Sequence, residues 1–210
     1  MVVPDDPRTE PAERRRRAIE AGHRVDQPAA RAALGDPDPV VRGAALGALA
    51  RMGALGAAEV TAALADPDPG VRRRAAEAAA RATGPGSRSA LLAALRAALG
   101  DDNPLVAEAA CWALGEAGDA ASVPALASVA RAHTDTRCRE AAVAALGAIG
   151  DPAGAGAVLD ALDDKPTVRR RATVALAAFD GPEVEAGLRR SLADRDWQVR
   201  QAAEILLAGD

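Results

Sequence analysis

Aromatic side chains are nearly missing from this chain. Its 210 residues include no tyrosine, one phenylalanine and two tryptophans, Trp112 and Trp197, although 49% of the residues are hydrophobic. The core must therefore be built from alanine, leucine and valine, whose small side chains allow helices to approach one another closely. The scarcity of aromatics excludes a core of stacked rings and predicts closely packed elements.

Lysine and cysteine are scarce as well. Lys165 is the only lysine, so nearly all positive charge is carried by arginine. We attribute this bias to a high-GC genome rather than to selection for phosphate binding. The two cysteines, Cys111 and Cys138, do not suggest a disulfide framework, and we expect both to be reduced thiols.

Long apolar runs and a hydrophobic N-terminal segment are missing too. No stretch approaches the length that spans a membrane, so the sequence predicts a protein of the cytoplasm with no membrane partner. The formal net charge is −4. This charge counts against tight, nonspecific binding of nucleic acid, because such binding depends on a basic surface.

What the chain does have is a repeated pattern. A leucine is followed two residues later by aspartate, then by a Val-Arg pair, then by alanine and leucine at helical spacing, as in the segment from Leu34 to Leu49. Six copies are present, and the arginine position falls at residues 42, 72, 107, 139, 169 and 200. A period of 30 to 35 residues is typical of a solenoid, whose usual function is to hold other molecules.

Each copy predicts two helices joined by a tight turn. Asp68 can cap the second helix of its copy, while Pro69 takes the first helical position, where a missing N–H costs nothing. The same arrangement of cap and proline occurs at Asp38 and at Asn103. The pattern therefore predicts an all-α protein.

The segments 109–119 (AACWALGEAGD) and 123–126 (VPAL) resemble the HEAT-like repeats of phycobilisome lyases. The resemblance covers about residues 26–210 and implies a right-handed α-solenoid of about six HEAT-like helix pairs. Residues 1–25 are expected to form a disordered tail, over 1–7, and an N-terminal capping helix. The run from Arg14 to Arg17 would give that helix a polar outer face.

The resemblance also implies a ladder of ion pairs between repeats, made by the aspartate and by the arginine six residues later. Ala107 and His133 interrupt the ladder in adjacent copies. This break indicates a local change of curvature, a site in the middle of the array, or simple drift. The predicted ladder residues are Asp36, Arg42, Asp66, Arg72, Asp163, Arg169, Asp194 and Arg200.

In such arrays the second helices line an inner, concave surface, so their exposed residues are the candidate partner-binding site. This stripe is mixed in charge around one aromatic side chain, which suits a protein or peptide better than a polyanion. Trp112 is either an anchor in this groove or a residue packed between repeats, whereas Trp197 is expected to pack over the preceding turn. The candidate partner-binding residues are Trp112, Glu108, Glu140, Arg73, Arg170 and Arg171.

Catalytic and metal-binding patterns are not indicated. Neither His23 nor His133 has a nucleophile nearby in the sequence. The HEAT-repeat hydroxylases bind iron through His-Glu dipeptides, and neither histidine here precedes a glutamate. We therefore predict no cofactor and a noncatalytic scaffold or adaptor that binds a protein or peptide.

Two enzymatic alternatives stay open on the resemblance. A HEAT-like DNA glycosylase, which excises alkylated bases, would use Trp112, Glu116 and Trp197. A chromophore lyase would need an acid such as Glu108 or Glu140 for proton transfer.

The sequence favours a monomer. The last predicted helix, Val199 to Leu207, carries apolar residues with no capping helix after it. A dimer through this C-terminal helix is therefore the alternative.

Overall fold

The computed structural model describes residues 10–82 and 86–208. These residues form thirteen α-helices and six short 3-10 helices, and none of the described residues lies in a β-strand. The all-α prediction is therefore confirmed. The chain divides into two compact units, Met1–Ala98 and Leu99–Asp210, which are described separately below.

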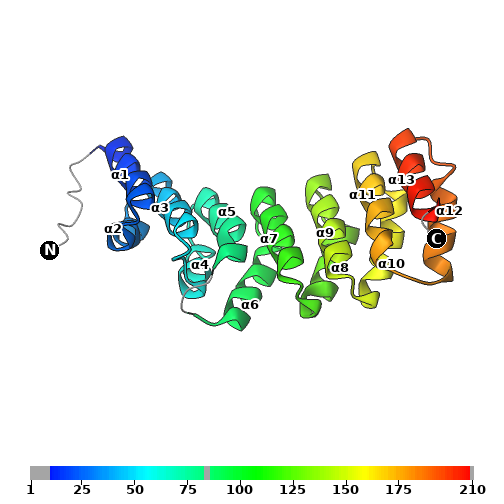
Figure 1. Ribbon diagram of the computed structural model, residues 1–210, viewed down its shortest axis with the longest axis horizontal. Helices are drawn as coiled ribbons and strands as arrows, with labels where there is room; N and C mark the ends of the chain where they lie inside the picture. Colours follow the sequence, from blue (N-terminus) through cyan, green and yellow to red (C-terminus); the bar gives the residue numbers. More distant parts are fainter. Residues whose placement is uncertain (1–9, 83–85, 209–210) are drawn as a thin grey trace. The chain divides into compact units, whose positions relative to one another are not determined.

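The first unit holds six α-helices. One layer is formed by α1 (Pro11–Arg24), α3 (Pro39–Arg51) and α5 (Pro69–Ala78), which pack side by side in that order (Figure 1). The other three helices form the second layer, in which α4 packs against α6. They are α2 (Gln27–Ala32), α4 (Ala57–Ala63) and α6 (Arg88–Ala98), with the 3-10 helices η1 (Ala33–Gly35) and η2 (Ala79–Arg81).

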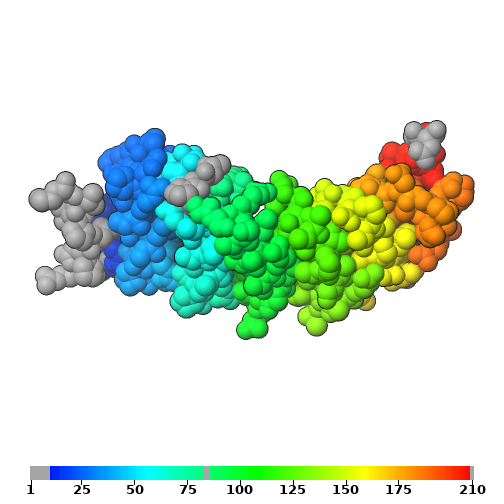
Figure 2. All heavy atoms as spheres, turned by 90° about the horizontal axis from the view of Figure 1, so that it is seen from below, coloured from blue at the N-terminus to red at the C-terminus, as the bar shows by residue number. Residues whose placement is uncertain are grey.

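The second unit repeats this plan with seven α-helices. Its first layer is formed by α7 (Pro104–Ala117), α9 (Thr136–Ile149), α11 (Pro166–Ala175) and α13 (Trp197–Ala208), each packed on the next. In the space-filling view the later repeats follow one another in sequence order (Figure 2). The second layer holds α8 (Val123–Ala132), α10 (Ala155–Asp160) and α12 (Pro182–Ser191), and the 3-10 helices are η3 (Ala120–Ser122), η4 (Pro152–Gly154), η5 (Ala161–Asp163) and η6 (Leu176–Ala178).

The second helix of each repeat starts where the sequence predicts it. The Asp38 carboxylate accepts a hydrogen bond from the backbone N–H of Val40 at 2.7 Å, and Asp68 accepts one from Gly70 at 2.8 Å. Proline follows each of these caps at the first helical position. The caps satisfy backbone donors that the first helical turn leaves without partners.

Small residues let the first-layer helices of the second unit approach closely. A Cβ atom at Gly115 of α7 would lie only 2.9 Å from the Cα atom of Ala145 on α9. A Cβ atom at Gly147 of α9 would lie 2.7 Å from the Cβ atom of Ala175 on α11. This close packing explains how the protein fills its core with almost no aromatic side chains.

Helix α1 differs from the predicted capping helix at one residue. Arg14 is not part of a solvated outer face: it is 5% exposed, and its guanidinium binds the Asp36 carboxylate through Nε at 2.8 Å and Nη2 at 3.2 Å. Arg14 stands three residues after Pro11, as Arg42 stands three residues after Pro39. We therefore interpret α1 as the second helix of a degenerate repeat. The predicted disorder of residues 1–7 lies outside the described residues.

Candidate functional site

The ladder arginines connect consecutive repeats. Arg42 donates from Nη1 to the carbonyl oxygen of Asp36 at 2.9 Å, within its own repeat. Its Nε and Nη2 atoms donate to the carboxylate of Asp66, in the next repeat, at 2.8 and 2.7 Å. The aspartate six residues earlier therefore contributes its backbone carbonyl, while the carboxylate partner comes from the following repeat.

The same geometry occurs at Arg169, which is buried. Its Nη1 donates to the carbonyl oxygen of Asp164 at 3.0 Å, and its Nε and Nη2 donate to the Asp194 carboxylate at 2.9 and 2.8 Å. Arg72 and Arg200 also donate to the carbonyl oxygen of the aspartate six residues before them, at 3.0 and 2.8 Å. A guanidinium fork thus ties one helix start to the next.

One ladder residue differs from the prediction. Arg139 binds the carboxylate of Asp164, with Nε at 2.6 Å and Nη2 at 2.8 Å, and not that of Asp163. Asp163 is exposed and lies 3.4 Å from the Arg190 guanidinium instead. This turn is one residue shorter than that of the first copy, so the carboxylate that faces the ladder stands one residue closer to the helix.

The ladder arginines hold their partner carboxylates in the charged form. Burial raises the pKa of Asp66, but hydrogen bonds from the Arg42 guanidinium and from the backbone N–H of Asp68 outweigh burial, so this pKa lies below its ordinary value. Hydrogen bonds from Arg139 and Arg169 likewise lower the pKa values of the two ladder carboxyls in the second unit. Each of these pairs is therefore ionised at neutral pH.

The ladder consists of rungs, each made by the arginine of one repeat and the carboxylate of the next. Its interruption affects a single rung. Ala107 removes the arginine of one repeat, and His133 removes the aspartate of the next. His133 still performs the local task of the aspartate, because its Nδ1 accepts from the backbone N–H of Asp135 at 3.0 Å, as Asp36 accepts from Asp38 at 2.8 Å. A pocket of about 440 Å³ lies at this rung, lined by Asp101, Asp102, Pro104, His133, Thr134 and Asp135.

In the second unit, two of the predicted partner-binding residues, Trp112 and Arg171, line a shallow apolar pocket, here called the Trp112 pocket. Trp112 projects from α7 and is 43% exposed, and Val174 of α11 is 53% exposed beside it. The pocket measures about 350 Å³. It is lined by Trp112, Ala144, Gly147, Ala148, Arg171, Val174, Ala175, Ala177 and Ala178.

Arg171 supplies the charge at the edge of this pocket. Its guanidinium carbon lies 5.8 Å from the centre of the Trp112 ring, within the range of a cation–π interaction. Its Nη2 lies 3.6 Å from the Glu140 carboxylate. The buried Nε atom has no hydrogen-bond partner in the described part of the chain. Trp112, Glu140 and Arg171 thus form one cluster across three helices.

The remaining predicted residues of the second unit lie elsewhere. Arg170 hydrogen-bonds to Gln198 and lies 3.6 Å from the Asp196 carboxylate, so it links α11 to the start of α13. Glu108 is half-buried on α7. Trp197 is 60% exposed, which contradicts the expectation that it packs over the preceding turn.

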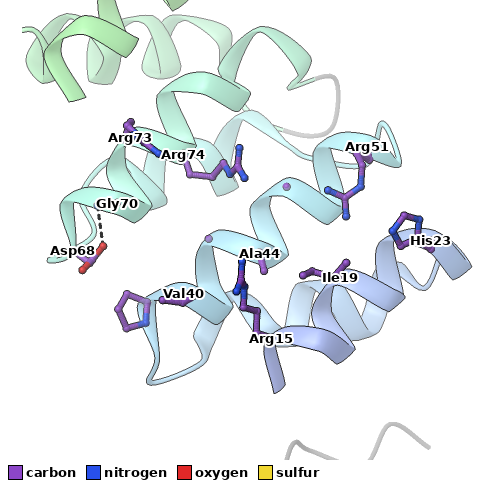
Figure 3. Close-up of a pocket in the computed structure, with 13 residues that line it drawn as sticks. Arg15, Ile19, His23, Val40, Ala44, Arg51, Asp68, Gly70, Arg73 and Arg74 are labelled. Carbon is purple, nitrogen blue, oxygen red and sulfur yellow. Dashed lines mark hydrogen bonds between the residues drawn. The ribbon is translucent and has the colours of Figure 1, made fainter. Parts of the chain in front are cut away.

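Arg73 belongs to a pocket of the first unit, here called the arginine pocket (Figure 3). It measures about 490 Å³ and lies over the exposed side of α3, between α1 and α5. Besides Arg73 its cationic residues are Arg15, Arg51 and Arg74, with His23 at one end. Arg15 and Arg51 were not predicted from the sequence as binding residues. The available signal was the pair Gly43 and Gly47, which leaves two positions on the exposed side of α3 without side chains.

The described residues contain no group of three or more histidine, cysteine or acidic side chains that could hold a metal ion. Burial raises the pKa of Cys111 to about 12 and that of Cys138 to about 11, so both thiols stay protonated at neutral pH. No helix in this part of the chain combines the length and apolar character needed to cross a membrane.

The family described as HEAT repeats matches residues 28–98, 57–147, 92–166 and 123–208. No curated protein sequence matches the chain.

Three solved structures illustrate the structural similarity. The CpcE and CpcF complex of phycocyanin lyase from Nostoc sp. PCC7120 is 26% identical, with a TM-score of 0.62 over 84% of this chain and 74% of that chain. An engineered protein is 21% identical, with a TM-score of 0.66 over 87% and 97%. A designed armadillo repeat protein in complex with the peptide (KR)4 is 18% identical, with a TM-score of 0.58 over 95% and 99%.

Proposed function

This chain belongs to the HEAT-repeat family, and we propose that it is a noncatalytic scaffold that binds a protein or peptide through the exposed face of its second helices. The observation that carries this proposal is the Trp112 pocket. A large aromatic side chain that is 43% exposed stands there in a chain with almost no aromatics. Tryptophan in an apolar pocket is the residue most often found to dominate a binding interface.

The surroundings of Trp112 suit a protein partner. Alanines and Val174 form an apolar floor, and Arg171 with Glu140 places both signs of charge at its edge. This arrangement of an apolar centre with a polar rim is typical of protein interfaces.

Preorganisation supports the same proposal. Trp112, Glu140 and Arg171 come from three packed helices, and Arg171 is already held by its contacts with the other two. Side chains that are ordered before binding lose little entropy when the partner docks. The structural likeness to a designed armadillo repeat protein in complex with a peptide supports only that helical arrays of this kind can hold a peptide.

The test compares two tryptophan variants. Wild type, Trp112→Ala and Trp197→Ala serve as baits in nuclease-treated lysate, and a captured protein is then purified and titrated against each. We expect Trp112→Ala to weaken binding by about 1–3 kcal/mol, because it removes the anchor. Trp197→Ala is the matched control, since it removes an exposed tryptophan from the same unit outside the Trp112 pocket, and it should bind as wild type does.

Two outcomes would contradict the proposal. If Trp112→Ala lowers the free energy of unfolding by as much as it lowers binding, Trp112 serves packing between repeats. If no protein is captured, and the wild type instead releases a modified base from duplex DNA or shifts the absorption of a bilin, one of the enzymatic alternatives holds. Both enzymatic assays use the purified full chain.

A further inference from the structure

We propose that the arginine pocket of the first unit binds an acidic peptide segment, with aspartate or glutamate side chains of the partner between the arginines. This site involves neither Trp112 nor the second unit, so it stands independently of the Trp112 pocket that carries the proposal above. The inference rests on the charge of the pocket, on the arginines that lack partners, and on the open surface of α3.

The charge of the pocket is strongly one-sided. Four guanidinium groups line it, from Arg15 on α1, Arg51 on α3, and Arg73 and Arg74 on α5 (Figure 3). The only carboxylate in the lining is Asp68, which already caps α5 by accepting from the backbone N–H groups of the next residues at 2.8 and 3.2 Å. This concentration of positive charge occurs in a chain whose net charge is −4, so it is a local feature.

The arginines of this pocket are poorly neutralised. Arg15 and Arg51 form no ion pair or hydrogen bond with any described residue. Arg73 and Arg74 share one carboxylate, that of Glu77, at 3.3 and 3.2 Å. Elsewhere in the same unit, Arg42 holds a carboxylate of its own through two hydrogen bonds. An anionic ligand would supply the partners that the pocket arginines lack.

The surface of α3 leaves room for such a ligand. A Cβ atom at Gly43 would have no other atom within 4 Å. At Gly47 a Cβ atom would lie 3.5 Å from Nη1 of Arg51 and 3.9 Å from Nε of Arg74. Guanidinium groups from two helices therefore approach the same point above α3. Like charges so arranged repel one another, and a carboxylate placed there would relieve that repulsion.

The apolar part of the lining favours a peptide over nucleic acid. Val40 is 53% exposed, and Ile19 and Pro39 lie beside it at the same pocket. A peptide can place an apolar side chain on this surface and a neighbouring carboxylate on the arginines, whose planar forks match carboxylate geometry. A sugar-phosphate backbone offers no such apolar group, and apart from the imidazole of His23 the lining holds no tryptophan, tyrosine or phenylalanine ring on which a base could stack.

The probe is a fluorescein-labelled peptide of alternating glutamate and valine, with the glutamine and valine peptide as its neutral counterpart. Fluorescence anisotropy of the full chain at low salt measures binding of both. We expect the acidic peptide alone to bind. Arg15→Gln and Arg51→Gln should each weaken it about tenfold, since each removes one charge-assisted contact worth about 1.4 kcal/mol or more.

Two further variants separate the pocket from general charge effects. Gly43→Leu should also abolish binding, because its side chain fills the open space above α3 without meeting another atom at Cβ. Arg16→Gln removes the same charge from the same helix, but Arg16 lies outside the pocket, so binding should stay within about twofold of wild type. Thermal unfolding of each variant verifies that it is folded.

Several results would overturn the inference. Equal losses of peptide affinity in Arg16→Gln and Arg15→Gln would show that the peptide is attracted by general charge. Unchanged peptide affinity in Gly43→Leu would show that the peptide binds outside the arginine pocket. Tighter binding of a labelled DNA oligonucleotide than of the acidic peptide would assign the pocket to nucleic acid. Trp112→Ala should bind the probe as wild type does, so failure of this inference leaves the proposed scaffold function untouched, and the reverse also holds.

Discussion

A ladder arginine connects two turns that belong to different repeats. Arg42 contacts a backbone carbonyl in its own repeat and both carboxylate oxygens of Asp66 in the next. The pair is largely shielded from solvent, since the two side chains are 15% and 11% exposed. Removing the Arg42 guanidinium would leave the Asp66 carboxylate largely shielded from water, with fewer hydrogen-bond donors to compensate for that desolvation.

We therefore expect Arg42→Ala to lower the free energy of unfolding by about 2–3 kcal/mol, the cost typical of losing hydrogen bonds to a charged group. The matched control is Arg131→Ala, because Arg131 also binds a carboxylate of the next repeat, that of Asp160, at 2.7 Å. Both side chains of that pair are exposed, so its loss should cost about 0–1 kcal/mol. Urea unfolding followed by circular dichroism measures both, and equal losses would show that burial of the ladder is unimportant.

At the scale of the helix pair, the missing rung reflects replacement of both members of one arginine–carboxylate pair. Each intact rung needs an arginine in one repeat and a carboxylate in the next, and Ala107 and His133 remove both partners together. His133 retains the hydrogen bond that shapes the turn. The pocket at this position lies between the turn that contains Asp101 and the turn that contains His133. In the intact repeats, Arg42 and Arg169 bridge the corresponding pairs of turns.

Restoring the rung tests this interpretation. Ala107→Arg alone and His133→Asp alone should each be neutral or destabilising, because each introduces a charge without its partner. The double variant should be more stable than the sum of the single effects predicts, by about 1–3 kcal/mol of coupling. A double-mutant cycle in urea unfolding measures the coupling. Additive effects would mean that a guanidinium at this position does not reach the next turn.

Local features of the repeat were predictable from sequence, whereas contacts between repeats were less so. The cap at Asp68 depends on residues two and three positions away, and it is present as predicted. Arg14 and Asp36 are 22 residues apart, and the pattern around Arg14 is too degenerate to show that it holds a ladder position. Asp164 replaces Asp163 because the conformation of a shortened turn decides which carboxylate faces the arginine.

The candidate sites show the same limit. Spacing along a helix put Trp112 at an outward-facing position but left open whether it packs between repeats, and the structure leaves it 43% exposed. The contact of Arg171 with the Trp112 ring joins two helices that are not neighbours in sequence, α7 and α11. The arginine pocket depends on which arginines have no carboxylate nearby, and that requires the positions of all the acidic side chains.

At the scale of the whole chain, each unit is a stack in which a helix is stabilised by its neighbours on either side. Helix α9 is packed against α7, α8, α10 and α11, whereas the main neighbours of α13 are α11 and α12. An apolar surface remains at that end: Ile205 is 65% exposed, and Leu206 and Leu207 line a pocket of about 340 Å³ with residues of α12. We retain the prediction of a monomer, with a dimer through α13 as the alternative.

This asymmetry predicts how hydrogen exchange varies along the second unit. Helix α9 buries six residues between its neighbours, whereas α13 buries Val199 and Ala203. Local opening costs less where fewer apolar contacts are broken, so amides of α13 should exchange with deuterium faster than those of α9, as mass spectrometry of peptic fragments would show. If α13 is protected as well as α9, a second copy covers its apolar face. That protection should then fall on dilution, because dissociation of a dimer exposes the helix again.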